Sequence, residues 1–319
     1  MPDPLPRPTA IPQPDAARGA DRAPDPDGAH GADCEPEYDA ARGANCDPDV
    51  SEGVTRVRVR RVGGDPTPDV VDWVAREEPL EIRLGGTPLA VVMRTPGHDA
   101  DLALGFLVSE RVVASRDQVL SVRHCREAPE PGNADNVIRV TLAQGVRVDW
   151  EALRRNLYAN SSCGLCGKAT IENALACASP ISDATRFPAS ALLSLPRRLA
   201  EAQPGFARTG GLHAAASFSS EGCLGPVRED VGRHNAVDKV LGDALRERSA
   251  PLAGRGLLVS GRISFELAQK ALAARAPLVA GFSAPSSLAI ELAERAGLTL
   301  VGFLRDDRFN VYGRAGRVA

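Results

Sequence analysis

The stretch that decides the fold is GLLVSGRISFELAQKALAARAPLVAGFSAPSSLAIELAERAGLTLVGFL, residues 256–304. Short, continuously apolar runs alternate in it with segments whose apolar residues recur at helical spacing. We expect strands at 256–261, 277–283 and 298–304, and helices at 264–276 and 286–297. Apolar strands between amphipathic helices are typical of a mostly parallel sheet that is covered on both faces. The second half of the chain is therefore predicted to be α/β.

The pattern changes on both sides of this stretch. We expect a helix at 232–248 and an edge strand at 308–313. Upstream, alternation and helical spacing predict strands at 54–62, 81–84, 87–95, 118–125 and 136–143, with helices at 98–113 and 149–160. Asp99 stands where it can cap the first of these helices. We expect a smaller α+β subdomain at 53–148 and an α/β domain at 149–319.

Residues 1–52 differ from the rest of the chain in composition. They hold four arginines, no lysine and 12 acidic residues, a net charge of −8, and almost no large apolar side chains. Such a segment cannot bury enough apolar surface to fold, so we expect a disordered acidic tail. The remaining chain has 34 basic and 29 acidic residues, or +5. This suits an anionic ligand but is too weakly basic to indicate nucleic acid.

Three further features bear on the cellular compartment. Nothing approaches 18 consecutive apolar residues, so no membrane span is expected. The first residues show neither a basic n-region nor an apolar h-region. The seven cysteines form an odd, scattered set, which is not the pattern of a disulfide framework. We expect a cytoplasmic protein without a membrane partner.

The most informative local motif is NSSCGLCGKATIEN, residues 160–173, in which Cys163 and Cys166 form a CxxC pair. A structural zinc site usually needs a second close pair of ligands, and none follows. A redox dithiol is expected after an early strand, whereas this pair follows a predicted helix. Sulfur chemistry is the third reading, because Lys168 and a helix N-terminus would stabilise a thiolate or persulfide. The spacing alone does not place this reading above zinc.

Two strand-to-helix turns are candidates for anion binding. Ser260, Gly261 and Arg262 occupy the first, and Ser283 begins the second. Free backbone N–H groups at such turns can hold a phosphate, and an arginine can add a charge-assisted hydrogen bond. The carboxyl ends of neighbouring parallel strands also face one edge of the sheet, where α/β proteins bind ligands. Ordinary helix capping explains either turn alone, but the pair favours phosphate binding.

A dense polar segment, REDVGRHNAVDK at 228–239, precedes both turns in the chain. On a helix, Asp230, His234 and Asp238 would share one face. The competing explanation is a solvated face with surface ion pairs. His98, in the turn RTPGHD, is more simply explained as a structural histidine.

Several strings, taken in order, resemble the formate dehydrogenase accessory sulfurtransferase family, FdhD. They are RTPGHDADLALGFLVSE (94–110), SSCGLCGKATIE (161–172), TGGLHAAA (209–216), EDVGRHNAVDKVLG (229–242), LVSGRISFELAQKA (258–271) and SAPSSLAIELAERAGLTLVGFLRDDRFNVY (283–312). The resemblance covers roughly residues 54–315. It implies a sulfurtransferase that carries sulfur from a cysteine desulfurase to a molybdenum or tungsten bis-pterin guanine dinucleotide cofactor. That cofactor, bound here as a substrate, then enters the catalytic subunit of formate dehydrogenase.

The resemblance also implies roles for particular residues. Cys163 matches the persulfide-bearing cysteine, and Cys166 would assist it. The cofactor-contact segment matches FLRDDR, which is Phe303, Leu304, Arg305, Asp306, Asp307 and Arg308. At the position of Asp306 the family pattern commonly has glycine. The anion turns (Ser260, Gly261, Arg262, Ser283) and His234 complete the expected cofactor site.

The family further implies a C-terminal three-layer domain similar to the cytidine deaminase fold, a homodimer, and no permanent metal. Two other classes compete with the sulfur carrier. A zinc-dependent nucleoside deaminase would need an HxE motif and a PCxxC motif, and the chain has neither. A non-catalytic, cofactor-binding chaperone for formate dehydrogenase, with structural zinc at the cysteines, is the remaining alternative.

Overall fold

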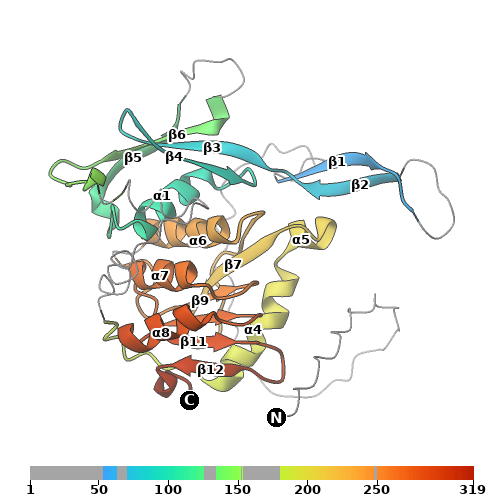
Figure 1. Ribbon diagram of the computed structural model, residues 1–319, viewed down its shortest axis with the longest axis vertical. Helices are drawn as coiled ribbons and strands as arrows, with labels where there is room; N and C mark the ends of the chain where they lie inside the picture. The colour runs from blue at the N-terminus through green and yellow to red at the C-terminus, as the bar shows by residue number, and fades with distance from the viewer. Residues whose placement is uncertain (1–52, 63–69, 126–133, 152, 154–179, 248–249) are drawn as a thin grey trace, which may run out of the picture. The chain divides into compact units, whose positions relative to one another are not determined.

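The computed structural model describes residues 53–62, 70–125, 134–151, 153, 180–247 and 250–319 (Figure 1). The chain divides into two units, Met1–Tyr38 and Asp39–Ala319, and every described residue belongs to the second. The predicted acidic tail, the CxxC motif and most of the predicted helix at 149–160 lie outside the described residues.

A six-stranded mixed sheet forms the C-terminal part. Its strands are β7 (His213–Phe218), β8 (Arg228–Asp230), β9 (Gly256–Val259), β10 (Leu278–Gly281), β11 (Thr299–Gly302) and β12 (Asn310–Gly313), in the order β12-β11-β10-β9-β7-β8. The three central strands β9, β10 and β11 are parallel, as the sequence predicts. The predicted edge strand is β12, which runs antiparallel to β11 because only a short loop joins them.

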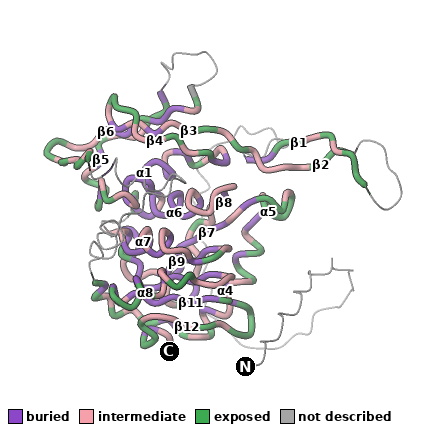
Figure 2. The backbone as a smooth tube through the Cα atoms, in the orientation of Figure 1, coloured by how far each residue is buried: buried purple, intermediate pink, exposed green. Residues whose placement is uncertain are grey.

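Helices cover both faces of this sheet (Figure 1). They are α4 (Ala189–Glu201) on one face, and α6 (Arg233–Glu247), α7 (Phe265–Ala273) and α8 (Ser287–Ala296) on the other. Successive residues of β9 alternate between the two cores: Leu257 packs toward α6 to α8, and Leu258 toward α4. Both faces are thus buried (Figure 2), which is why the strands are continuously apolar.

A second, four-stranded sheet lies in the N-terminal part. It consists of β3 (Glu78–Leu84), β4 (Thr87–Arg94), β5 (Val119–His124) and β6 (Val137–Leu142), in the order β4-β3-β6-β5, with short 3-10 turns at Arg116–Gln118 and Ala134–Asn136. Helix α1 (Asp99–Ser109) packs between this sheet and α6. One hydrophobic core therefore runs from the four-stranded sheet through α1 to the six-stranded sheet.

The crossing of α1 and α6 depends on two glycines. A Cβ added at Gly105 would lie 1.7 Å from the backbone oxygen of Asp238, and one added at Gly242 would lie 1.9 Å from that of Asp101. Each helix thus presents a glycine to the backbone of the other. Any side chain at either position would force the helix axes apart.

Strands β1 (Val54–Val59) and β2 (Val70–Ala75) form an antiparallel two-stranded ribbon of their own. In Figure 1 it extends away from β3, and the short helix α5 (Pro204–Thr209) contacts β2. Strand β1 confirms the predicted strand at 54–62, although it ends at Val59. Most ribbon residues are exposed or half-buried (Figure 2).

Two local expectations are wrong. Asp99 does not cap α1: His98 occupies the cap position with φ 57° and no capping side-chain bond, and Asp99 is the first helical residue. Asp230 does not share a helix face with His234, because it ends β8 before α6 begins. The α/β fold class is confirmed, with more than one sheet. No helix among the described residues is both long and apolar enough to cross a bilayer.

Candidate functional site at the carboxyl edge of the sheet

The two predicted anion turns and the predicted cofactor segment meet at one edge of the six-stranded sheet. The backbone N–H of Ser283 donates to the oxygen of Gly261 at 3.4 Å, and the N–H of Phe303 donates to the oxygen of Ser283 at 3.2 Å. They meet because β9, β10 and β11 are parallel, so their carboxyl ends lie side by side. The structure brings these sequence-predicted residues together.

The serines of these turns have structural bonds. Ser260 Oγ accepts the backbone N–H of Ala214 at 2.9 Å and so ties β9 to β7. Ser264 and Ser286 cap α7 and α8. Helix capping therefore accounts for the roles of some of the serines in these turns, as the simpler of the two explanations predicts. Arg262 is exposed at the edge, and Ser283 is half-buried.

The segment from Phe303 to Arg308 is tied to the neighbouring strand. Leu304 is buried, and its N–H donates to the oxygen of Gly281 at 3.1 Å. Arg305 Nη1 donates to the oxygen of Phe282 at 2.6 Å. Phe303 adopts a left-handed conformation, φ 54°, with 45% of its surface exposed. Non-glycine residues in this backbone region cluster at functional sites, which makes the segment a candidate for ligand binding.

The charged residues of this segment face solvent. Asp306, Asp307 and Arg308 are all exposed, and Arg308 Nη1 pairs with Asp307 Oδ2 at 2.9 Å. An exposed ion pair of this kind is weak and can rearrange around a ligand.

Two histidines border the same edge. The imidazole of His213 lies 3.7 Å from where a Cβ at Gly261 would be. Partial burial, then the nearby Arg233 and His234, lower the pKa of His213. His234 Nε2 lies 2.9 Å from Glu266 Oε2, and this contact with His234 lowers the pKa of Glu266. His234 is thus beside the edge but paired with α7.

A second polar cluster surrounds the turn that precedes α1. Arg94 makes a bidentate ion pair with Asp99, both bonds 2.9 Å, and also donates to Asn136 Oδ1 at 3.1 Å. His124 Nε2 lies 3.8 Å from Asp99 Oδ2. The hollow beside them, about 390 Å³, is also lined by His98. Only the RTPGHD string signalled this cluster in the sequence, because His124 comes from β5 and Asn136 from the 3-10 turn before β6, both distant in the chain.

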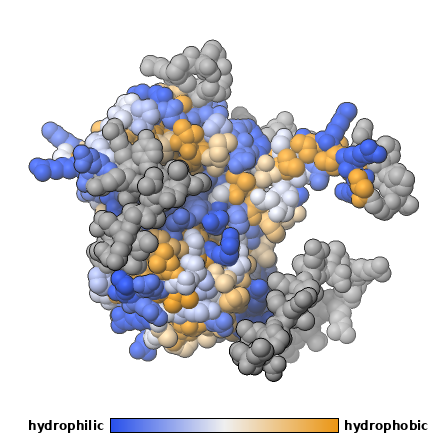
Figure 3. Space-filling model, viewed as in Figure 1, coloured by the Kyte–Doolittle hydropathy of each residue, from blue (hydrophilic) through white to orange (hydrophobic). Residues whose placement is uncertain are grey.

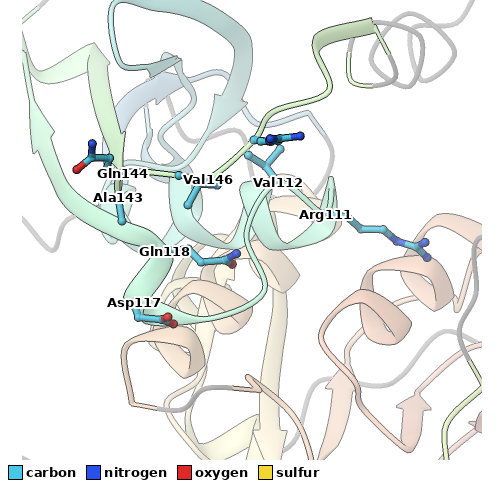
Figure 4. A pocket seen from close by; sticks show the side chains of 9 residues that line it. Arg111, Val112, Asp117, Gln118, Ala143, Gln144 and Val146 are labelled. Carbon is cyan, nitrogen blue, oxygen red and sulfur yellow. The ribbon is translucent and has the colours of Figure 1, made fainter.

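A larger and more open hollow, about 490 Å³, lies between the end of α1 and the end of β6 (Figure 4). Its lining is mostly polar loop residues, including Arg111, Gln118 and Arg147. It contains none of the residues predicted from the sequence. Among the described residues, no group of three or more His, Cys, Asp or Glu side chains could hold a metal ion.

The fold is α/β, and the candidate ligand edge of its sheet carries backbone turns, arginines and the exposed ring of Phe303. The chain belongs to the FdhD/NarQ family, whose model matches residues 75–319. The resemblance found in the sequence is thereby confirmed.

Individual proteins similar to this chain agree with the family match. A protein of Streptomyces coelicolor named sulfur carrier protein FdhD is 53% identical over 270 residues, which is 83% of this chain and 94% of that relative. One of Mycobacterium tuberculosis with the same name is 50% identical over 268 residues, 82% and 97% of the two chains. The crystal structure of a putative formate dehydrogenase accessory protein from Desulfotalea psychrophila matches with a TM-score of 0.65 at 23% identity, covering 84% of this chain and all of that one. That likeness shows the fold alone.

Proposed function

We propose that this protein is a sulfur carrier that serves the maturation of a formate dehydrogenase. Cys163 accepts sulfur from a cysteine desulfurase, and the carboxyl edge of the six-stranded sheet binds the bis-pterin guanine dinucleotide cofactor as the substrate that receives it. The names of the relatives support the carrier role. One structural observation supports the proposed binding site: three residues, Gly261, Ser283 and Phe303, meet at one edge of the sheet.

The first chemical step is a persulfide exchange. The Cys163 thiolate attacks the outer sulfur of the desulfurase persulfide, so that one S–S bond breaks as another forms and the desulfurase thiolate leaves. No net oxidation occurs. In the second step the Cys166 thiolate attacks the inner sulfur of the Cys163 persulfide. This forms a Cys163–Cys166 disulfide and releases the outer sulfur as hydrosulfide, with both electrons supplied by the two cysteines. A cellular thiol reductant then restores the dithiol.

The rest of the chain contributes the surface that binds the cofactor. In this proposal the turn at Gly261 and the side chains of Arg262 and Arg308 bind phosphate oxygens, for which exposed arginines are suited. Phe303 offers its exposed ring to a planar base. A three-layer domain like the cytidine deaminases, a homodimer and a cytoplasmic location belong to the same proposal.

The test is intact-protein mass spectrometry after incubation with a cysteine desulfurase and cysteine. We expect wild type to gain one sulfur atom, Cys163→Ala to gain none, and Cys166→Ala to retain the sulfur longer. Cys125→Ala is the matched control, because Cys125 is a buried free thiol directly after β5. Equal sulfur gain in Cys163→Ala would refute the assignment. No gain in wild type, with about one tightly bound zinc per chain, would instead support the chaperone.

A further inference from the structure

The β1–β2 ribbon is a sheet with two open edges. Neither strand pairs with any other strand among the described residues. A two-stranded sheet is marginally stable by itself, and this one is held mainly at its base. There Trp73 lies under the guanidinium of Arg56, 4.5 Å from the ring centroid, and that of Arg208 from α5, at 5.4 Å. The outer part of the ribbon is left to contact something else.

A row of arginines runs along the ribbon from its base to its outer part. Arg56 and Arg58 lie opposite Trp73 and Val71 in the antiparallel register and share one face with them. Arg60 and Arg61 follow the strand directly. Arg58, Arg60 and Arg61 are exposed, and within the described part of the chain they have no hydrogen-bonded or ion-paired partner.

No carboxylate of β1 or β2 balances this row. Asp72, the only acidic residue on either strand, lies opposite Val57 and therefore on the other face. Charged and hydrophobic residues lie side by side along the ribbon (Figure 3), and Val62 at its outer part is 90% exposed. The ribbon thus presents positive charge at alternate positions along a free strand edge.

We propose that this ribbon binds an extended, acidic segment of a partner protein. The segment adds as a third strand along the free edge of β1 and places acidic side chains at alternate positions beside Arg58 and Arg60. An open strand edge offers unpaired N–H and C=O groups for such an addition. Opposite charges on neighbouring strands then fix the register.

Two features favour a polypeptide over nucleic acid. The described ribbon offers no free aromatic platform, because Trp73 already contacts two guanidinium groups. The arginines also alternate with valines at the period of a strand, which matches a strand partner. Apart from Ala75, the ribbon lies before the part of the chain that the family model matches, and this inference does not rest on the proposed sulfur transfer.

The experiment uses the full chain and fluorescein-labelled peptides, with binding measured by anisotropy. The probe is a short peptide of alternating Glu and Thr, compared with a peptide of the same composition in two blocks. We expect the alternating peptide to bind more tightly and to weaken with added salt. Arg58→Glu/Arg60→Glu should weaken it at least about tenfold, because two cross-strand pairs become repulsive.

Arg197→Glu/Arg198→Glu is the matched control, since it reverses two exposed arginines on α4. It should leave the affinity unchanged. N-methylation of the probe along one edge should abolish binding if the peptide adds as a strand. Three results would each overturn the proposal: no binding, equal binding of both peptides, or an unchanged affinity in the ribbon variant. Tighter binding of single-stranded oligothymidylate to the same arginines would assign the surface to nucleic acid instead.

Discussion

At the scale of single residues, Asp230 is a buried carboxylate with a structural role. It is fully buried and accepts hydrogen bonds from Thr95 N at 3.1 Å and Gly232 N at 2.8 Å, and it pairs with Lys239 Nζ at 2.8 Å. Lys239 also donates to the oxygen of Thr95 at 2.8 Å. Burial lowers the pKa of Lys239, and Asp230 opposes that effect. The pair is therefore a satisfied bridge between β8, α6 and the turn before α1.

Removing one partner of the Asp230–Lys239 pair should lower the stability of the folded protein. We expect Asp230→Ala to lower the free energy of unfolding by about 3–5 kcal/mol, because it leaves a buried lysine without its countercharge. Glu291→Ala breaks the exposed pair with Arg295 and should cost less than about 1 kcal/mol. Urea denaturation of both variants measures the difference. Equal losses of stability in the two variants would show that Asp230 does not stabilise the fold as a buried ion-pair partner.

His98 is a second residue whose setting matters. It holds a left-handed φ of 57° at the start of α1, and burial, then Arg228 and Lys239, lower its pKa to about 4. Its side chain is still 53% exposed, so solvent reduces the energetic effect of this shift.

The sign of the pH effect follows from this lowered pKa. Between about pH 4 and the ordinary histidine pKa of 6.5, the unfolded chain binds a proton at His98 and the folded chain does not. Stability contributed by neutral His98 is present above pH 6.5 and is lost as the pH falls toward 4. We expect His98→Asn, which tolerates the same backbone, to show a smaller loss of urea midpoint over this range. An identical pH dependence in wild type and variant would contradict the assignment.

At the scale of elements, the crossing of α1 and α6 is the most sensitive contact. Gly105→Ala or Gly242→Ala would press a methyl group into the backbone of the facing helix, which cannot move aside as a side chain can. We expect a loss of about 3 kcal/mol or more, at the upper end of overpacking effects. Gly86→Ala is the control, because nothing lies within 4 Å of its added Cβ. Thermal unfolding compares them, and near-wild-type stability of Gly105→Ala would disprove the close crossing.

Elements also show where sequence patterns are informative. The strands and helices between residues 256 and 304 were predicted correctly, because the strands are short, fully buried apolar runs and the helices bury their apolar residues at helical spacing. Helix α4 was missed. Pro196 within it argues against a helix, yet the burial of Leu192, Leu195 and Leu199 on the sheet stabilises it.

At the scale of the whole molecule, one core and several long-range ion pairs join the N-terminal sheet to the C-terminal sheet. Leu80, Leu102, Leu241 and Leu257 belong to the same hydrophobic cluster. Arg228, from β8, pairs with Asp101 on α1 and with Asp243 on α6. These ion pairs tie β8 to both helices, so charge as well as the shared core joins the two parts.

The sequence by itself determined the α/β class and the edge where the turns at Gly261 and Ser283 meet. These follow from local periodicity and from the rule that parallel strands end at one edge. The family, and with it the place of Phe303 in the candidate site, came from the resemblance of several strings in order. Only the tertiary structure decided that Asp230 pairs with Lys239, that His234 pairs with Glu266, and that β1 and β2 form an open ribbon. The partners in these contacts come from different elements of the chain, and a local pattern does not indicate which charged side chains will face each other once the core has formed.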